Sequence, residues 1–410
     1  MKAKVAIVGS GPSGCYAAQA LLKAAPDLQV DIIDALPVPF GLVRYGVASD
    51  HQGTKAVSRQ FSRIFERQGA GFFGNVRIGQ DISLATLRSA YDAVILAAGL
   101  SADRKLGIPG DTLPGVFGSA ALTRALHEHP EADALPDLGS APVIVGNGNV
   151  AIDLLRVLAK TADELHGSDL GPGPTAWLAA NRFETLTVIG RSPAGKAKFD
   201  PVMVRELAKL TNVTIDVAGV HSSEDEEERK RLEALSEIHG HAKGSTRIIF
   251  RFGLQLRSVE GTDRVSGLKV ASAEGEEIIP ASSILTAIGF QSSGDLDREA
   301  LLSAAEPDAS GKLAENLFAA GWFWRGPRGT IPDSRTEAQA LATRLLEEIS
   351  PDPDREGSHI FAGLRDVVDY TGWQKIDTAE LAAAAPNRCR QKLAGKNELL
   401  RVAGEQETNS

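Results

Sequence analysis

Short apolar runs alternate with amphipathic helices along this chain, a pattern that predicts parallel strands covered by helices. The first unit has a buried strand at Val5–Val8, a helix that ends near Ala25 and a second strand at Gln29–Ile33. A later unit repeats this order, with a strand at Val143–Val145 and a helix to about Ala162. Each is a βαβ unit. We therefore expect an α/β protein with two Rossmann-like domains.

The segments between and after these units extend the prediction. Thr54–Gln68 has apolar residues on one helical face, whereas Pro37–Asp50 is rich in proline and glycine and is expected to be a loop. Arg247–Leu256 and Val265–Ala271 alternate in the manner of antiparallel strands. A charged helical excursion is expected at 221–240. Further strands and helices are predicted at Val76–Ile78, Ala93–Ala97, Leu186–Ile189, Val202–Leu210, Val213–Val217, Ser283–Ile288, Leu317–Ala320 and Ser334–Ile349.

The first glycine turn, GSGPSG at 9–14, lies between a strand and a helix, as a dinucleotide-binding fingerprint requires. Gly9 permits the tight turn, Gly11 lets the backbone approach a pyrophosphate, and Gly14 lets helix and strand pack closely. The helix N-terminus offers free N–H groups to the phosphates. Asp34, twenty residues after Gly14, is expected to accept hydrogen bonds from ribose hydroxyls.

This first turn fits either FAD or NAD, and two later strands favour FAD. The strand at 93–97 runs into Gly99, and the strand at 317–320 runs into Gly321 and Trp322. In open α/β sheets, ligands bind outside the carboxyl ends of the strands. Chains of this architecture use both of these strand ends to close around a flavin. We therefore expect FAD at the first turn.

The second glycine turn, GNGNVA at 146–151, has alanine as its last residue, which the fingerprint permits. The next strand runs into Gly190, Arg191 and Ser192. An NAD site usually has an acidic residue at this point to bind the ribose 2′-hydroxyl, whereas an arginine suits a 2′-phosphate. The second turn is therefore expected to hold NADP(H), and NADH stays open as an alternative.

The order of the strands predicts that the second domain is inserted into the first. The FAD-binding domain is expected to comprise residues 1–103 and 310–410, with an Ala-rich and partly irregular extension from about 351. The NAD(P)H-binding domain is expected over 104–309.

Composition narrows the setting of the protein. The 410 residues are 43% hydrophobic and 24% charged, as in soluble globular proteins, and no apolar run is long enough to span a bilayer. The two cysteines form no CxxC motif, so we expect no metal site and a reducing, cytoplasmic location. The formal net charge of −9 disfavours nucleic acid and anionic membranes as partners. We expect a monomer or weak dimer.

Longer motifs carry a more specific signal than the glycine turns. Residues 34–55 read DALPVPFGLVRYGVASDHQGTK, residues 321–331 read GWFWRGPRGTI, and residues 91–100 read YDAVILAAGL. Together with LGIPG, LPGV and DYTGWQKID, these segments resemble the adrenodoxin reductase family of ferredoxin–NADP reductases. The resemblance implies hydride transfer from NADPH to flavin N5, followed by one-electron transfers to a ferredoxin-type iron–sulfur protein.

The resemblance also assigns residues to the two nucleotides. It implies FAD contacts at Ser13, Asp34, Leu42, Ile78, Trp322, Gly329, Thr330 and Ile331. Trp322 and residues 329–331 match the segment that passes the flavin ring, where a backbone N–H can reach its N1/O2 edge. It implies nicotinamide-nucleotide contacts at Asn147, Gly148, Asn149, Val150, Arg191 and Ser192. The nicotinamide is expected to dock near Gly329. His51, Trp322 and Gly329 are the residues expected beside the reacting rings.

The chain departs from the family pattern at two positions. The family has a second arginine where this chain has Ser192, and Lys196 and Lys198 either compensate or are ordinary solvated lysines. The family pairs its histidine with a glutamate that aligns with Met203. Glu206, one helical turn further, could partly take the place of that glutamate.

Two other functions remain open at this stage. The first is an NAD(P)H diaphorase or oxidase, or another FAD oxidoreductase, with a small-molecule acceptor. The second is a nucleotide sensor without turnover. A thioredoxin- or glutathione-reductase activity would need a redox pair of cysteines, which the chain lacks. Arg205 is a candidate contact for an acidic partner, whereas the mixed charges at 224–231 are expected to be a solvated helix face.

Overall fold

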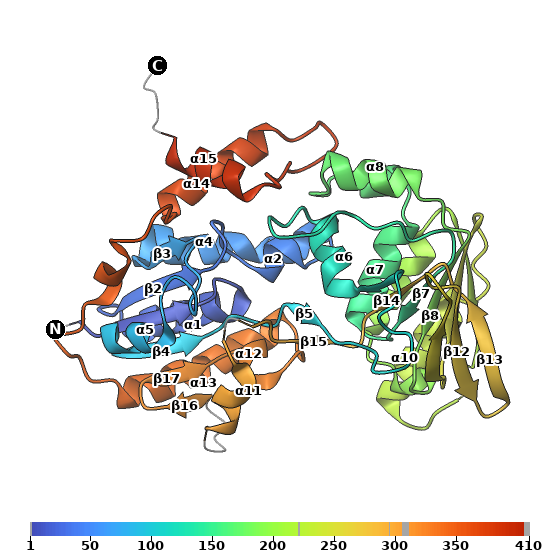
Figure 1. Cartoon of the computed structure of the whole chain (residues 1–410), viewed down its shortest axis with the longest axis horizontal. Helices are drawn as coiled ribbons and strands as arrows, with labels where there is room; N and C mark the ends of the chain where they lie inside the picture. The colour runs from blue at the N-terminus through green and yellow to red at the C-terminus, as the bar shows by residue number, and fades with distance from the viewer. Residues whose placement is uncertain (1, 220–221, 295, 306–310, 406–410) are drawn as a thin grey trace.

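The computed structural model describes residues 2–219, 222–294, 296–305 and 311–405. Two six-stranded sheets organise the chain, and helices cover them (Figure 1). This arrangement confirms the predicted α/β class. No helix within the described ranges has the length and apolar character to cross a membrane.

The first sheet combines the N-terminal segment with strands that return near residue 312, in the order β16-β17-β4-β1-β2-β3. Neighbouring strands are parallel, except that β16 is antiparallel to β17. The apolar side chains of β1 and β4 are buried, as expected of strands covered on both faces. The strands are β1 (Lys4–Val8), β2 (Gln29–Asp34), β3 (Gly71–Gly74), β4 (Ala93–Leu96), β16 (Lys312–Ala314) and β17 (Leu317–Ala319).

The second sheet is parallel throughout, in the order β6-β14-β7-β8-β10-β9. Its strands are β6 (Val116–Gly118), β7 (Pro142–Val145), β8 (Thr185–Ile189), β9 (Val213–Val217), β10 (Thr246–Arg251) and β14 (Ser283–Thr286). A three-stranded antiparallel sheet packs nearby, formed by β11 (Gln255–Glu260), β12 (Gly267–Ser272) and β13 (Gly275–Pro280).

Each glycine turn leads into a helix, α1 (Pro12–Ala24) after the first and α7 (Asn149–Ala159) after the second. Helix α1 packs between α4 (Val57–Gln68) and the long C-terminal helix α13 (Ile331–Glu348). The remaining helices are α2 (Leu42–Tyr45), α3 (Gln52–Lys55), α5 (Leu84–Ala90), α6 (Ser119–Leu126), α8 (Pro172–Ala180), α9 (Pro201–Glu206), α10 (Glu226–Ile238), α11 (Arg298–Ser303), α12 (Trp322–Arg325), α14 (Tyr370–Ala382) and α15 (Lys396–Gly404).

Two connectors and the tail join the halves of the molecule. The short strands β5 (Ala102–Asp103) and β15 (Phe290–Gln291) pair with each other where the chain passes between the sheets. Helices α14 and α15 lie beside the first half, and the loop between them reaches towards α8 (Figure 1). In that loop the Asn387 carbonyl accepts a 2.9 Å hydrogen bond from the Gly167 N–H.

Four predicted elements need correction. Val76–Ile78 is not a strand, and the edge strand is β3, whose flanking glycines weakened its signal. Arg247–Leu256 is not one antiparallel strand, because β10 is parallel to both its neighbours and only the following β11 is antiparallel. Pro37–Asp50 contains the short helix α2, and the helix predicted at Thr54–Gln68 is α4 preceded by the separate turn α3.

One predicted segment start and one predicted domain boundary fall on residues outside the described ranges. The charged helix forms as α10, whereas the predicted start of that segment, His221, lies outside the described residues. The predicted domain boundary between 309 and 310 also lies outside them.

Candidate active site

The first glycine turn leaves an open space next to the start of α1. A side chain at Gly9 (φ 108°) or Gly14 would overlap protein backbone, at the Ala97 carbonyl and the Gly9 carbonyl respectively. A Cβ atom on Gly11 would meet no protein atom within 4 Å. Gly11 is also the N-cap residue of α1. Because glycine has no side chain to accept hydrogen bonds from the first N–H groups of the helix, these groups stay available for phosphate oxygens.

The carboxylate of Asp34 faces this turn from the end of β2. It accepts hydrogen bonds from the backbone N–H of Ser10 (2.9 Å), from the Ser10 hydroxyl and from the Leu36 N–H (3.0 Å). Burial raises the pKa of Asp34, although these hydrogen bonds act in the opposite direction. The structure thus places Asp34 at the predicted edge of the site, and its ribose contact stays a prediction.

The segment FGL at 40–42 lies beside the same turn. Phe40 has a left-handed backbone (φ 82°), an unusual conformation for a residue with a side chain, and its N–H donates to the Ser10 carbonyl at 3.1 Å. A Cβ atom on Gly41 would lie 3.1 Å from the Gly11 Cα atom. Leu42 is therefore close to the turn and 43% exposed, whereas Ile78 is buried in the core of the first domain.

The chain returns to the first turn through residues 321–334. A side chain on Gly321 (φ 63°) would overlap the hydroxyl of Ser13, and this hydroxyl contacts Ser334 of α13 at 3.3 Å. Helices α1 and α13 therefore begin side by side. Gly99 (φ 70°), which follows β4, has open space around its Cα atom.

Four further residues of this C-terminal segment belong to the predicted flavin site. The ring of Trp322 stacks on Phe290, with 5.5 Å between ring centroids. Gly329 (φ 79°) and Thr330 are exposed, and the Thr330 N–H donates to the Asp333 carboxylate at 2.6 Å. Ile331 then opens α13, and the first N–H groups of a helix have no partner within the helix.

The second glycine turn repeats the open geometry of the first. A side chain on Gly146 (φ 135°) would overlap the Ala287 carbonyl, whereas a Cβ atom on Gly148 would have only the Lys198 Cβ atom, at 3.9 Å, within 4 Å. The amide nitrogen of Asn147 is buried and has no hydrogen-bond partner among the described residues. A buried donor without a partner is costly. An unpaired donor beside an open turn fits a bound pyrophosphate.

The rest of the predicted nucleotide segment supports this turn. The Asn149 side-chain oxygen accepts a 2.7 Å hydrogen bond from the Asp200 N–H, and Val150 is half-buried in the first turn of α7. Gly148 caps α7 without a side chain, as Gly11 caps α1. Both helix N-termini are therefore open to phosphate.

Basic side chains surround the place predicted for the 2′-phosphate. Arg191 is exposed at the end of β8 and has no ion-pair partner among the described residues. The half-buried Ser192 follows it, and Lys196 and Lys198 are exposed on the next loop. The Lys198 N–H donates to the Asn147 carbonyl at 2.9 Å, which ties this loop to the glycine turn. These positive charges favour a 2′-phosphate at this place, and the contacts of Arg191 and Ser192 with it stay predictions.

His51 lies between two carboxylates of the second half of the molecule. Its Nε2 atom is 3.3 Å from Glu206 and its Nδ1 atom is 3.7 Å from Asp153. Met203 packs against the core of the second domain. The structure therefore brings Glu206 to the histidine, as the alternative from the sequence allowed.

Sequence reasoning missed the charged residues around this histidine. Asp50 pairs with Arg156 and Lys160, and Arg156 also lies 3.2 Å from Asp153. Burial alone would raise the pKa of Asp50, but the two cations hold it well below its ordinary value. Burial raises the pKa of Asp153. A stripe of polar residues in the otherwise apolar helix α7 was the available signal.

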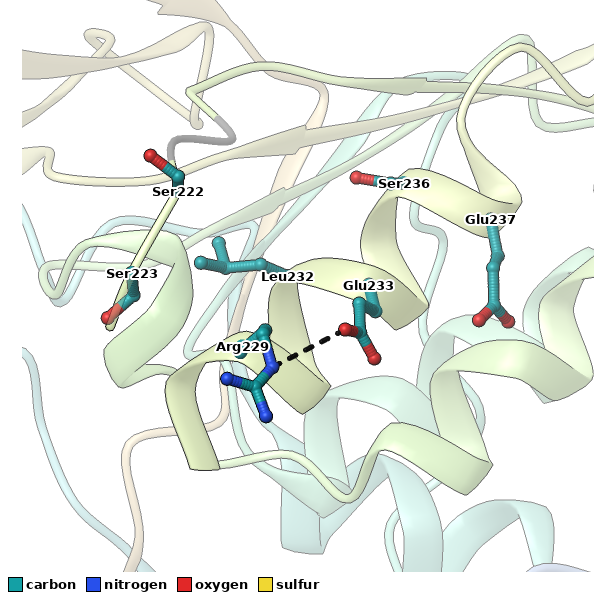
Figure 2. Close-up of a pocket in the computed structure, with 7 residues that line it drawn as sticks. All are labelled: Ser222, Ser223, Arg229, Leu232, Glu233, Ser236 and Glu237. Atoms are coloured by element: carbon teal, nitrogen blue, oxygen red, sulfur yellow. Dashed lines mark ion pairs between the residues drawn. The ribbon is translucent and has the colours of Figure 1, made fainter. Parts of the chain in front are cut away.

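A surface hollow of about 460 Å³ lies along α10, and none of the residues predicted for either nucleotide lines it. Figure 2 shows Arg229 and Glu233 of this helix side by side, paired at 3.6 Å. Glu237 of the same helix holds Arg205 through hydrogen bonds of 2.6 and 3.0 Å. Arg205, the candidate contact for an acidic partner, is therefore already neutralised by a neighbour.

Comparisons with known proteins agree with this geometry. A family model described as pyridine nucleotide-disulphide oxidoreductase matches residues 3–328. Cindoxin reductase of Citrobacter braakii is 40% identical over 409 residues, covering 95% of this chain and 88% of that protein. The mitochondrial NADPH:adrenodoxin oxidoreductase of Drosophila melanogaster is 33% identical over 443 residues, covering 98% and 93%.

A third relative also has a solved structure. NADPH-ferredoxin reductase FprA of Mycobacterium tuberculosis is 33% identical over 451 residues, covering 97% of this chain and 98% of that protein. The structure of that protein in complex with NADPH superposes on this one with a TM-score of 0.91. At 30% identity, the superposition covers 98% of this chain and all of that one.

Proposed function

The chain belongs to the pyridine nucleotide-disulphide oxidoreductase family, and within it to the FAD- and NADP(H)-dependent adrenodoxin reductase group. On this premise we propose that it passes electrons from NADPH through FAD to a ferredoxin-type iron–sulfur protein. The observation that carries the proposal is the pair of open glycine turns, each at the uncapped N-terminus of a helix, in one chain.

Each glycine turn and the residues around it would bind one of the two nucleotides. FAD, when bound, supplies the capacity to take a hydride and to release electrons singly. Gly11 and the start of α1 would hold its pyrophosphate, and the N–H of Ile331 would meet the edge of its ring. Gly148 and the start of α7 would hold the pyrophosphate of NADPH, and Arg191 its 2′-phosphate. His51 would remain hydrogen-bonded to Glu206 beside the reacting rings.

Three expectations belong to the same proposal. The FAD domain would comprise residues 1–103 and 310–410, and the NAD(P)H domain 104–309. The protein would act in the cytoplasm as a monomer or weak dimer. Nucleic acid would not be a partner, since the formal net charge is −9.

Anaerobic titration of the purified protein tests the first half of the proposal. NADPH should bleach the visible absorbance of bound FAD, and a protein whose flavin stays oxidised would be a sensor and not a reductase.

Cytochrome c reduction tests the second half of the proposal, the transfer of electrons from FAD to a ferredoxin. It should depend on an added [2Fe–2S] ferredoxin, whereas ferricyanide should be reduced directly. Equal cytochrome c rates with and without ferredoxin would assign the protein to the diaphorases.

A further inference from the structure

The carboxylate of Asp50 joins the loop before α3 to helix α7 and to its C-cap residue. Arg156 donates two hydrogen bonds to it, one of them 3.0 Å from Nη2 to Oδ1, and Lys160 donates a third. Asp50 directly precedes His51, and α7 begins at the second glycine turn. The three residues Asp50, Arg156 and Lys160, here the Asp50 clasp, therefore link the histidine to the helix that starts at the nucleotide.

The clasp is built on one stripe of α7. Asp153 and Arg156 lie three residues apart, and Lys160 follows four residues later at the C-terminal cap, so their side chains share a face of the helix. Most of the other residues of α7 are buried and apolar. This charged stripe faces the loop of the first domain and not bulk water, since the Arg156, Asp50 and Lys160 side chains are 3%, 10% and 14% exposed.

Charges this buried are costly unless each has its partner. Removing one member of a buried pair leaves an uncompensated charge. Besides Asp50, the guanidinium of Arg156 has two carboxylates within reach, Asp153 at 3.2 Å and Glu206 at 3.6 Å. These are the same two carboxylates that flank His51. Without Asp50, Arg156 would depend on these two carboxylates alone, and His51 contacts the same two.

We propose that Asp50 is a positioning residue for hydride transfer, which rests on the proposed function. Through Arg156 and Lys160, it fixes the orientation of α7, and with it the bound nicotinamide nucleotide, relative to the loop that carries His51. It also accepts hydrogen bonds from both terminal nitrogens of Arg156, so the guanidinium does not depend only on the two carboxylates beside the histidine. Among the described residues, the hydrogen bonds and ion pairs of the Asp50 side chain go to Arg156 and Lys160 and not to either glycine turn. Its effect therefore falls on the geometry of the reacting rings and not on nucleotide affinity.

The test is rapid anaerobic reduction of the FAD-loaded protein by NADPH. Asp50→Asn keeps the shape and removes the charge, so the reduction rate at saturating NADPH should fall about ten- to a hundredfold. The dissociation constant for NADPH should change less than about threefold. The long-wavelength charge-transfer absorbance of nicotinamide stacked on flavin should weaken in the same variant. Lys160→Gln, which removes one of the two cations, should give a smaller loss of the same kind.

Asp163→Asn is the matched control, because this carboxylate is 95% exposed and follows α7 closely. It should leave rate and affinity unchanged. An unchanged reduction rate in Asp50→Asn overturns the proposal, and so does a loss confined to NADPH affinity. If Asp50→Asn does not fold, an unaltered rate in Lys160→Gln overturns it equally. A wild-type protein that NADPH does not reduce would refute the proposed function itself.

Discussion

The two glycine turns share one fingerprint, yet the chain covers them differently. Around the first turn, Gly321 touches Ser13, and Ser13 touches Ser334 at the start of α13. The strained Phe40 closes a further side. The second turn opens towards three exposed basic residues on the loops after β8, namely Arg191, Lys196 and Lys198.

This contrast shows how one motif can serve two kinds of ligand. The fingerprint supplies the pyrophosphate cradle in both places. How long each nucleotide stays bound depends on the residues that the rest of the chain places around this cradle. Both cradles have free space for phosphate, but the first is enclosed in the sense that segments 40–42 and 321–334 flank it. This enclosed turn suits a cofactor that stays through many turnovers. The second turn, which is flanked by exposed basic residues, suits a nucleotide that must bind and leave in each one.

The largest expected effect is that of Gly14→Ala in the enclosed turn. A methyl group there would overlap the Gly9 carbonyl and lie 3.2 Å from Ile7 Cγ2, so strand β1 and helix α1 could not keep their spacing. Overpacking of this kind costs about 1–3 kcal/mol. The purified variant should lack FAD, as measured by the ratio of flavin to protein absorbance. A variant with full flavin content would contradict this account of the turn.

Next come Gly11→Ala and Gly148→Ala, a matched pair whose methyl groups have free space in the protein alone. Both variants should fold normally, as measured by circular dichroism. Gly11→Ala should weaken FAD binding about tenfold or more, because the methyl group blocks the approach of the pyrophosphate. Gly148→Ala should keep its FAD and raise the KM for NADPH instead. If Gly148→Ala lost FAD, the assignment of the two turns would be reversed.

Arg191→Ala should have a somewhat smaller effect, confined to the open site. A charge-assisted hydrogen bond contributes about 1.5–3 kcal/mol, so kcat/KM for NADPH should fall roughly ten- to a hundredfold. The value for NADH, which has no 2′-phosphate, should stay the same. Arg229→Ala removes an exposed arginine of α10 and should leave both values unchanged. An unaltered preference in Arg191→Ala would place the phosphate elsewhere.

Both turns could be predicted from the sequence because Gly9 and Gly14 each leave room for nearby backbone atoms. Gly9 and Gly14 are needed for contacts within a few residues or between adjacent strands, and such needs are visible in a motif. The β10 strand shows the opposite case. Its alternation arises because Arg247 faces Asp216 on an exposed side of a parallel sheet, and periodicity cannot distinguish this from antiparallel pairing.

The charged cluster at His51 lies further beyond sequence reasoning. Asp50 and Arg156 are 106 residues apart and meet only when the two domains pack. Each looks like an ordinary polar residue in its own segment. The resemblance pointed to His51 and to a glutamate partner, but only the fold distinguishes Glu206 from Met203, because the choice depends on which side of α9 faces the loop.

The smallest predicted effect concerns acid and His127, the buried C-cap residue of α6. His127 is buried, which lowers its pKa to about 3, with Lys55 and Lys392 acting in the same direction. An unfolded chain takes up this proton near pH ~6.5. Between about pH 6.5 and 3 the unfolded state therefore binds more protons, and the free energy of unfolding falls as the pH falls.

Replacing His127 should flatten this acid dependence. His127→Gln keeps a polar group near the Thr123 carbonyl, which lies 2.7 Å from Nδ1 of the histidine, but cannot titrate. Its thermal midpoint should fall less steeply below pH ~6.5 than that of the wild type. Near pH ~5 its acid-induced loss in free energy of unfolding should be smaller than that of the wild type by about 1–2 kcal/mol. Because the first turn is enclosed, FAD should stay bound in acid until the chain unfolds. Release of FAD at a pH at which circular dichroism still shows a folded chain would contradict this expectation.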